Sequence, residues 1–479
     1  MIDTIVIYDA PGETRVALLA GDRTVEVFHH RAGRESIVGN IYLGRVTRVE
    51  PGLNAAFIDI GAEAAGFLNA ADARTDPVGE FRPIGAYVEE GGAVLVQAVR
   101  DAIGGKGPRL TARPTLAGRR LVLLPGQHRI IASRRIGDAG EQARLVGLVS
   151  GAAGGDAGFL VRTAAAGAGA DEIAGEVAEL DDAWAAIEAR RSRAKAPARL
   201  LEDAAPVPRA LRDHVHPGLR RVVVDSPAAL AAARDYCARS APEVESLLEL
   251  HRDAEPVFER FGVEAALEAA LEARVELPSG GALTVEETQA VCAIDVDTGR
   301  DARGGALKTN LEAAAEIARQ LRLRAIGGRI VVDFVHMTSR DDRMRVIEAL
   351  REALADDRDH AAPVTHTRLG LVETRRRRTR PSLAGLLTES CAPCDGQGRR
   401  RSADTAALGV ARAVARDAAS APKGAVAVTA APEVAAALTA PAIGEALAAA
   451  TGRAIDVRPD PARPREAAEV TFGGEGKTA

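Results

Sequence analysis

The feature that most constrains the fold is a strand–helix–strand pattern between residues 290 and 337. The segment QAVCAIDVD is an apolar run that ends in acids, and GGRIVVDFVHM is a second apolar run that contains an acid. Between them, TNLEAAAEIARQLRLR has helical periodicity, with Thr309 and Glu312 in capping-box positions at its predicted start. A strand, a helix and a strand in this order predict two adjacent strands of one sheet.

Three aspartates lie at the ends of these two predicted strands. Asp295 and Asp297 are two residues apart, so their side chains point to one face, and Asp333 ends the second strand. Mg²⁺ is commonly held by one or two carboxylates and several waters, and such an ion can orient water and stabilise a phosphodiester under attack. The pattern predicts a catalytic Mg²⁺ site at these three residues; the alternative is that they are solvated acids in turns.

The other segments predict further parts of an α/β multidomain protein. Residues 1–35 contain three short strand patterns, and the glycine-rich block 38–101 contains about five more, which favours a small β-barrel of the OB type. A mixed region follows, with a predicted helix at 171–193 in which we expect Trp184 to lie in the core. The segment AAPVP at 204–208 has the composition of a linker, and residues 403–479 indicate a small α/β unit.

Length and charge narrow the classes of function. The 479 residues suffice for about three domains or more. The net charge of −5 argues against a uniformly basic nucleic-acid coat but allows a local basic groove. No apolar run reaches about 18 residues, and residues 1–10 lack the basic region of a signal peptide. We therefore expect a cytoplasmic protein with no membrane span.

The 4 cysteines are too few for a disulfide framework in so long a chain. Cys391 and Cys394 form a C-x-x-C motif within CAPCDGQG, which is half of a tetrathiolate zinc site. Cys237 and Cys292 are isolated, and we expect them to be buried structural thiols. A half-site predicts that a second copy of the chain supplies the other two thiolates; a redox pair or two unrelated thiols are the alternatives.

Three further groups of residues have a composition typical of RNA contacts. Phe57 and Phe67 lie in the predicted barrel, with Lys106 nearby in sequence, and exposed aromatics on such barrels stack with bases. A core position for Phe57 is the alternative. Arg162 and Thr163 follow an apolar segment and could together hold a phosphate monoester. The run Arg375 to Arg378 could contact phosphates, although a solvated charge run is the more common explanation.

In their order along the chain, these segments resemble the RNase E/RNase G family of bacterial single-strand endoribonucleases. The resemblance extends from residue 39 to residue 398, and the length is closer to that of RNase G than to that of full-length RNase E. The matching segments are GNIYLGRVTRVEPGLNAAFIDIG, GKGPRLT, FLVRTAAAG, VELPSGGALTVEETQAVCAIDVDTG, KTNLEAAAEIARQLRLRAIGGRIVVDF, LGLVETRRRRTR and CAPCDGQG.

The resemblance implies a Mg²⁺-dependent endoribonuclease of single-stranded RNA that acts in rRNA and mRNA processing and decay and favours 5′-monophosphorylated substrates. It also implies a homodimer joined by a shared zinc link, with assembly into a tetramer left open. The implied parts are an RNase H-like subdomain at 1–35 and 205–277, an inserted S1-type OB domain at 36–109, a 5′-sensor region at 110–204, a DNase I-like catalytic subdomain at 278–388, the zinc link at 389–402 and a small domain at 403–479.

The family's functional residues can be assigned, residue by residue, to positions of this sequence. The implied roles are Mg²⁺ binding for Asp295 and Asp333, catalysis for Asp297, RNA binding for Phe57, Phe67 and Lys106, 5′-phosphate sensing for Gly118, Val122, Arg134, Arg162 and Thr163, and zinc binding for Cys391 and Cys394. Three residues depart from the family: Asp297 replaces an Asn, His336 replaces an Asp, and His360 replaces an Arg beside the sensor pocket. A weakened RNA-binding relative is therefore the alternative function, and His360 predicts 5′-end sensing that strengthens as the pH falls.

Overall fold

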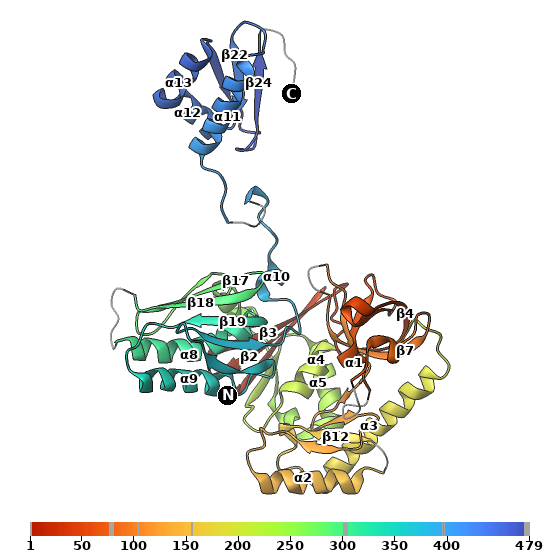
Figure 1. The fold of residues 1–479 in the computed structure, drawn as a ribbon. Coiled ribbons are helices and arrows are strands. Elements are labelled where there is room, and N and C mark those ends of the chain that lie inside the picture. Colours follow the sequence, from red (N-terminus) through yellow and green to blue (C-terminus); the bar gives the residue numbers. More distant parts are fainter. Residues whose placement is uncertain are drawn as a thin grey trace. The chain divides into compact units, whose positions relative to one another are not determined.

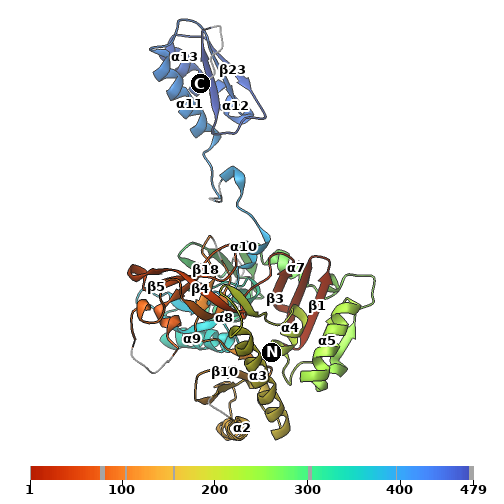
Figure 2. The same cartoon turned by 90° about the vertical axis from the view of Figure 1, so that its right-hand side faces the viewer.

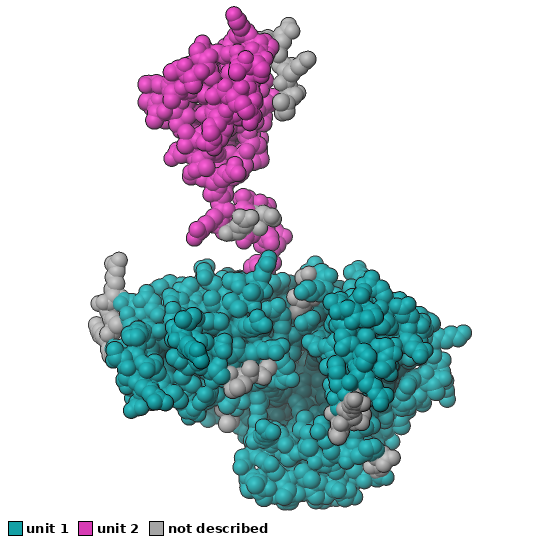
Figure 3. Space-filling view, in the orientation of Figure 1, with its two compact units in different colours: residues 1–387 teal, residues 388–479 magenta. Residues whose placement is uncertain are grey.

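A computed structural model describes residues 2–75, 81–102, 105–154, 157–299, 305–394, 396 and 398–473. The chain divides into two compact units, residues 1–387 and residues 388–479, which Figure 3 distinguishes by colour. Within the described residues no single helix is long and apolar enough to cross a membrane; one bent pair, Pro432–Thr439 with Pro441–Thr451, passes that test by length and composition. The predicted α/β multidomain class is confirmed, since both units contain helices and β-sheets.

The first unit contains a five-stranded sheet whose strands come from two distant segments, in the order β15-β14-β1-β2-β3. Strands β15, β14 and β1 run parallel to one another, β2 is antiparallel to β1, and β3 is antiparallel to β2. The strands are β1 Thr4–Ala10, β2 Glu13–Ala20, β3 Arg23–Arg31, β14 Arg221–Val224 and β15 Leu248–Leu250. The associated helices are α4 Pro206–His214, α5 Pro227–Ser240, α6 Val257–Arg260 and α7 Val263–Ala269, with a 3-10 helix at Pro242–Leu247. The three strands predicted within residues 1–35 are confirmed.

Helices cover both faces of this sheet, which explains why β1 is apolar at successive positions. Ile5 and Ile7 point toward α4 and α5, whereas Val6 points toward α6 and α7. Figure 2 shows α4 and α5 beside β1 and β3. Pro206 begins α4, so the predicted linker at 204–208 is wrong in its second half. A proline at the first helical position lacks only an N–H group that the helix would leave unbonded, which makes it a good helix start.

A closed five-stranded barrel lies in sequence between β3 and β14, as predicted. The strands follow one another as β4-β5-β6-β8-β7, and β4 also pairs with β7 to close the barrel, consistent with an OB fold. The elements are β4 Ile41–Glu50, β5 Ala55–Asp59, β6 Gly66–Asn69, β7 Ala93–Arg100, β8 Arg109–Thr111, α1 Ala70–Ala73 and 3-10 helices at Pro51–Leu53 and Ile84–Ala86. Strand β13, Ala198–Leu201, pairs with β4 from outside the barrel.

A four-stranded sheet of order β11-β12-β10-β9 follows the barrel. Its elements are β9 Leu116–Ala117, β10 Leu121–Leu124, β11 Ile130–Ala132, α2 Ala139–Ala152, β12 Gly158–Val161, a 3-10 helix at Thr163–Ala165 and α3 Ala170–Arg191. Helices α2 and α3 bury Leu145, Val149 and Ile173 against this sheet. Trp184 of α3 is only half-buried, although it packs against the same core.

A six-stranded sheet, ordered β16-β17-β18-β19-β21-β20, realises the strand–helix–strand prediction. Strands β18 and β19 are adjacent and parallel, and α8 connects them. The elements are β16 Arg274–Glu276, β17 Ala282–Glu287, β18 Val291–Asp297, α8 Gly305–Leu323, β19 Gly328–Asp333, α9 Arg340–Leu354, β20 His360–His366, β21 Val372–Arg376 and α10 Leu383–Leu387. Figure 1 shows α8 and α9 on one side of this sheet.

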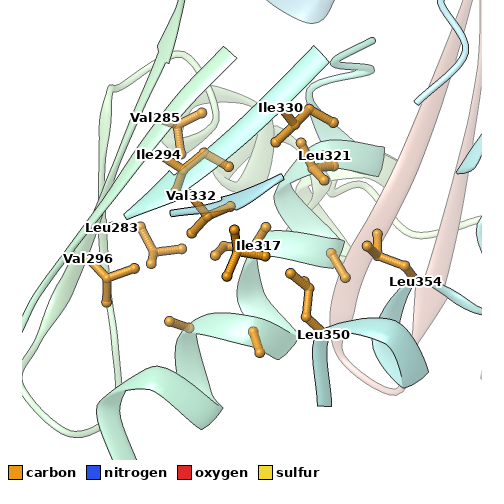
Figure 4. Close-up of a cluster of buried hydrophobic side chains, with 14 of the residues drawn as sticks. Leu283, Val285, Ile294, Val296, Ile317, Leu321, Ile330, Val332, Leu350 and Leu354 are labelled. Atoms are coloured by element: carbon orange, nitrogen blue, oxygen red, sulfur yellow. The ribbon is translucent and has the colours of Figure 1, made fainter. Parts of the chain in front are cut away.

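The core of this sheet lies between the strands and α8 and α9. Ile294 and Val332 face Ile317 of α8 and Leu350 of α9, as Figure 4 shows. Burying side chains of this size contributes about 1.5–3 kcal/mol each. Because strand side chains alternate, the residues between them, including the predicted acids, must lie on the opposite face.

The predicted start of α8 is wrong. The helix already includes Gly305, so Thr309 lies inside it, buried, and not at its N-cap. The carboxylate of Glu312 accepts a hydrogen bond from the backbone N–H of Ser279 at 2.8 Å, outside the helix. A capping-box pattern inside a helix therefore serves here to fasten the turn before β17.

Ion pairs join the five-stranded and six-stranded sheets. Glu26 of β3 pairs with Arg322 of α8 at 3.0 Å and with Arg380 at 2.9 Å. Although burial raises the pKa of Glu26, these two guanidinium groups hold it at about 2. Glu26 is therefore ionised over the physiological range; through it, Arg322 anchors the end of α8 on β3, and Arg380 anchors the segment between β21 and α10 there.

We expect His214 to make the fold sensitive to mild acid. Its ring packs on Phe28 at 5.2 Å, and burial, reinforced by the charge of Arg358, lowers its pKa from 6.5 to about 3. Below about pH 6.5 the unfolded chain binds a proton at His214 that the folded chain does not, so the free energy of unfolding falls as the pH falls toward 3. At about pH 5 the loss is about 2 kcal/mol from this residue.

Chemical denaturation at about pH 7 and about pH 5 measures this effect. His214→Gln, which cannot be protonated there, should show a smaller difference between the two pH values than the wild type. His29 and His30, whose pKa values burial lowers to about 4, leave a residual dependence in both proteins. An equal pH dependence in the variant and the wild type would contradict the prediction.

The second unit contains a three-stranded sheet of order β23-β22-β24 with helices, which confirms the small α/β unit predicted within residues 403–479. Its elements are a 3-10 helix at Ala392–Cys394, α11 Ala403–Ala418, β22 Val426–Ala430, α12 Pro432–Thr439, α13 Pro441–Thr451, β23 Ile455–Pro459 and β24 Ala468–Phe472. Val426 and Val428 of the central strand are buried with Val414 of α11 and Val434 of α12, which gives this unit its own core.

Candidate functional site

The predicted acidic pair lies on the open face of the six-stranded sheet. Asp295 and Asp333 are register partners at the ends of the parallel strands β18 and β19, and both side chains are exposed. Neighbouring strands are about 4.8 Å apart, so the two carboxylates lie side by side. Thr284 of β17 is the partner of Asp295 on its other side.

Asp297 is placed differently from the acidic pair. It lies two residues beyond Asp295 on β18, opposite Ala282. Its Oδ1 atom accepts a hydrogen bond from the backbone N–H of Gly299 at 2.9 Å. Within the described residues no three His, Cys, Asp or Glu side chains are placed to hold one metal ion. The pair Asp295 and Asp333 alone still fits Mg²⁺, which takes one or two protein carboxylates and otherwise water or substrate oxygens.

The buried side chain of Asn310 positions the segment that follows Asp333. Its Nδ2 atom donates to the carbonyl of Val335 at 2.8 Å, and its Oδ1 atom accepts from the N–H of the same residue at 3.0 Å. This pair of hydrogen bonds fixes the backbone directly after the acid. Sequence reasoning missed Asn310; its signal is an amide in the buried stripe of an amphipathic helix.

The barrel presents Phe57 and Phe67 together on its outer surface. They are register partners on β5 and β6, their rings meet edge-to-face at 5.9 Å, and the guanidinium of Arg48 lies 5.1 Å from the Phe57 ring centre. Both are half-buried, whereas Ala56 and Ile58 point into the barrel core. The core alternative for Phe57 is therefore wrong, and the two rings form a platform of the kind on which bases stack.

Lys106 lies near this platform in the chain that enters β8. Its side chain is exposed, and Phe67 donates its N–H to the carbonyl of Pro108 at 2.7 Å. A Cβ on Gly107 would come within 2.0 Å of the carbonyl oxygen of Ala65, so only glycine allows this close approach. Gly107 thereby lets the chain after Lys106 pass close to Ala65, directly before the strand that bears Phe67.

The four-stranded sheet places Arg162 and Thr163 at the end of β12. Nη1 of Arg162 donates to the carbonyl of Gly118 at 2.5 Å, and Thr163 is exposed with its hydroxyl 3.5 Å from that of Ser133. A Cβ on Gly118 would come within 2.3 Å of Glu176 Oε1, which explains the glycine there. Val122 is half-buried on β10, and Arg134 is exposed after β11.

Asp213, which sequence reasoning missed, pairs with Arg162. Its Oδ1 atom lies 2.9 Å from Nη2 of Arg162, and its Oδ2 atom lies 3.0 Å from Nη2 of Arg212. Although burial raises the pKa of Asp213, these guanidinium groups hold it well below its usual range. Asp213 is the last residue but one of α4, 51 residues from Arg162, so no local pattern could indicate the contact.

Arg358, rather than His360, contacts Asp213. The guanidinium of Arg358 donates to the carbonyl oxygen of Asp213. The ring of His360 instead bonds the hydroxyl of Thr374 at 2.9 Å across β20 and β21. A permanent positive charge therefore lies beside Arg162, and the pH dependence expected from His360 loses its structural basis.

The arginine run of β21 divides between structure and surface. Arg376 is buried and pairs with Asp357 at 2.7 Å, while Arg378 donates to the carbonyl of Gly327 at 2.8 Å. Arg375, Arg377 and Arg378 are all exposed, although Nη2 of Arg377 donates to the carbonyl of Arg358 at 2.6 Å. Only some of these residues are thus available for phosphate contacts.

The four cysteines fall into a buried pair, as predicted for Cys237 and Cys292, and a more accessible pair. Cys237 and Cys292 are buried, and burial raises the pKa of their thiols to about 11 and about 12. Cys391 is exposed, and the N–H groups of Cys394 and Gly396 both donate to its carbonyl at 3.2 Å. The Cys394 sulfur accepts from the N–H of Gly398 at 3.3 Å. A compact turn that brings together an exposed Cys391 and a partly exposed Cys394 fits half of a tetrahedral zinc site.

A sequence model of the "Ribonuclease E/G family" matches residues 115–379, more than half of the chain and including the acidic pair and Arg162. The chain is 38% identical over 430 residues to Ribonuclease G of Escherichia coli (strain K12), which covers 87% of this chain and 88% of that protein. The chain belongs to the ribonuclease E/G family. The resemblance found in the sequence is therefore confirmed.

Other relatives agree with this family membership. Ribonuclease G of Haemophilus influenzae is 37% identical, with 85% of this chain and 86% of that protein covered. Ribonuclease E of Escherichia coli (strain K12) is 36% identical, with 85% of this chain but only 40% of that protein covered. Membership makes this chain an endoribonuclease, and the length relation matches ribonuclease G.

Proposed function

We propose that this chain is a Mg²⁺-dependent endoribonuclease that cleaves single-stranded RNA in rRNA and mRNA processing and decay. The observation that carries the proposal is the register pair Asp295 and Asp333, two exposed carboxylates at the ends of adjacent parallel strands. Like charges directly opposite each other are unfavourable unless a cation lies between them. Two carboxylates with open coordination positions suit a Mg²⁺ ion that also binds a substrate phosphate.

The chemistry that bound Mg²⁺ supplies is the orientation of water and the stabilisation of charge on the phosphodiester. Asp295 and Asp333 would hold the ion, and Asn310, through Val335, keeps the backbone after Asp333 in place. Phe57 and Phe67 would stack on bases of the single strand. Hydrolysis breaks the bond between phosphorus and the 3′-oxygen, so the products carry a 5′-phosphate and a 3′-hydroxyl.

A cleavage assay on an A/U-rich single-stranded RNA with a 5′-monophosphate, with and without Mg²⁺, tests this proposal. Cleavage that requires Mg²⁺ supports it. RNA that is bound but left intact in both conditions indicates the alternative, a catalytically weakened RNA-binding relative. Asp297 favours that alternative, since it adds a negative charge one step from the acidic pair where the family is expected to have an Asn.

We expect the preference for 5′-monophosphorylated RNA to depend on Arg162. A monophosphate carries nearly two charges, and Arg162 and Thr163 can give it charge-assisted hydrogen bonds that a 5′-hydroxyl cannot accept. Arg162→Ala should therefore lower cleavage of the monophosphorylated RNA by about tenfold and leave the 5′-hydroxyl RNA within about twofold.

Asp213→Asn provides the comparison for Arg162. Because Asp213 holds Nη2 of Arg162, the variant should lose part of the preference while retaining cleavage of 5′-hydroxyl RNA. With Arg358 in place of a titrating His, the ratio of the two rates should be flat between about pH 6.5 and 8. A ratio near one in the wild type would refute sensing through this pocket.

The finer architecture and assembly form part of the same proposal. The five-stranded sheet corresponds to the RNase H-like subdomain, the barrel to an S1-type OB domain, the four-stranded sheet to the 5′ sensor and the six-stranded sheet to the DNase I-like catalytic subdomain. This correspondence follows the order of the sheets along the chain. We place the protein in the cytoplasm, where its RNA substrates are made.

Zinc should control the oligomeric state. Cys391 and Cys394 supply two of the four ligands that a structural zinc ion takes, so we propose that a second copy supplies the others and that the protein is a homodimer or a tetramer of such dimers. Cys391→Ser should lower bound zinc and shift the protein toward monomer. Native mass spectrometry measures both quantities; an oligomer without zinc in the wild type would exclude the link, and Cys237→Ser, at a buried thiol, is the control.

A further inference from the structure

A pair of arginines occupies the same open sheet face as the acidic pair. Arg329 of β19 and Arg375 of β21 are register partners on antiparallel strands, and both side chains are exposed. Asp333 follows Arg329 by four residues on β19, an even number, so both side chains point to one face of the sheet. At about 3.3 Å per residue the two positions are about 13 Å apart.

Nothing within the described part of the chain neutralises these arginines. No carboxylate there forms an ion pair or hydrogen bond with Arg329 or Arg375. Glu373, two residues from Arg375 on the same face, accepts a hydrogen bond from Thr365 at 3.2 Å instead. Like charges directly opposite each other on a sheet are destabilising, so an anion between the two guanidinium groups would remove an unfavourable interaction.

The face itself is open to a long ligand. Helices α8 and α9 cover the other side of the sheet, which bears Ile330 and Val332 (Figures 1 and 4). Arg329 and Asp333 alternate with these two residues along β19 and therefore lie on the open side. A polyanion that reaches the acidic pair through a metal ion can therefore extend along β19 to the arginines. Guanidinium groups suit phosphate oxygens because their planar N–H donors match them in pairs.

We propose that Arg329 and Arg375 form a clamp for backbone phosphates of the RNA strand that is cleaved at Asp295 and Asp333. The clamp rests on the proposed function. It places the RNA on one side of the cleaved bond along the open face of the sheet. The contact is to phosphates, so it contributes affinity and register and does not select bases.

RNA binding by the full-length chain tests the clamp without relying on cleavage. The background is Asp295→Asn, the probe is a fluorescent single-stranded RNA of about 20 nucleotides with a 5′-hydroxyl, and anisotropy is measured over a range of salt concentrations. Arg329→Gln with Arg375→Gln should raise Kd by about tenfold at low salt and reduce the slope of log K against log salt by about 1.4, two contacts at about 0.7 each.

A matched double variant separates the clamp from general electrostatics. Arg239→Gln with Arg345→Gln removes the same charge from exposed positions on α5 and α9. The control should leave Kd within about twofold. Equal losses in the two double variants, or no loss in either, would overturn the clamp.

Cleavage by the protein with Asp295 intact separates the clamp from the nuclease proposal. The clamp variant should raise KM with little change in kcat, because its contacts are the same before and during the reaction. If the wild type cleaves RNA and the clamp variant binds normally, only the clamp is wrong. If the wild type does not cleave RNA and the clamp variant still loses affinity, the clamp stands and the nuclease proposal fails.

Discussion

Replacing Asp295 or Asp333 by Asn should lower the rate of RNA cleavage by on the order of 10²–10³-fold while leaving RNA affinity within about threefold. Each substitution removes one of the two ligand charges at the ends of β18 and β19, and a neutral amide is a poorer ligand for Mg²⁺. The RNA contacts attributed to Phe57 and Phe67 lie in the barrel and are unchanged. Single-turnover cleavage and anisotropy in the same buffer measure the two quantities.

Asp297→Asn is the informative comparison for this prediction. Oδ1 of Asp297 accepts a hydrogen bond from the N–H of Gly299, and an Asn side chain offers the same acceptor without the charge. We expect cleavage by this variant to stay within about fivefold of the wild type or to rise. Undiminished cleavage in both Asp295→Asn and Asp333→Asn would show that the catalytic metal lies elsewhere.

Asp357→Ala should destabilise the first unit by about 3–5 kcal/mol. The side chains of Asp357 and Arg376 are each only 3% exposed, and Oδ2 of Asp357 lies 2.7 Å from Nε of Arg376. Without the carboxylate the buried guanidinium of Arg376 loses its closest charged partner and keeps only the carbonyl of Ile326 at 3.0 Å and a longer ion pair with Asp359 at 3.5 Å. Chemical denaturation followed by circular dichroism measures the loss.

An exposed pair on α9 provides the control for this stability prediction. Asp342 and Arg345 are 3.4 Å apart with side chains 34% and 61% exposed, and such pairs contribute at most about 1 kcal/mol. Asp342→Ala should therefore change the free energy of unfolding by less than about 1 kcal/mol. Similar losses for Asp342→Ala and Asp357→Ala would mean that burying the Asp357–Arg376 pair does not increase the free energy lost when its carboxylate is removed.

Local periodicity was enough to predict the elements that form from neighbouring residues. The single elements of the strand–helix–strand unit, of the five-stranded barrel and of the small α/β unit each depend on a pattern within about 20 residues, and these three parts are confirmed. The predicted start of α8 was wrong because Thr309 and Glu312 match a capping pattern, whereas in the fold their side chains contact Ser279. The linker at 204–208 was wrong because Pro206 can begin a helix as well as interrupt one.

The candidate site shows the same difference between residues placed by local patterns and residues placed by tertiary contacts. Asp295 and Asp333 could be paired in advance because parallel strand ends share one sheet edge. Asp213, Arg358 and Asn310 could not, because their partners lie on other elements and each contact exists only once those elements pack. Sequence reasoning therefore found the residues proposed to touch RNA or metal and missed the residues that hold them in position.

The five-stranded sheet has a consequence for the order of folding during synthesis. Its strands β1 and β14 pair Ile7 with Val224, so the sheet cannot close until β14 has left the ribosome. At about 5–20 residues per second this delay is on the order of 10–40 s, during which β1, β2 and β3 offer an unpaired edge. The barrel, whose strands are near one another in sequence, can fold within that interval. We therefore expect the barrel to become resistant to protease on shorter nascent chains than β1 does.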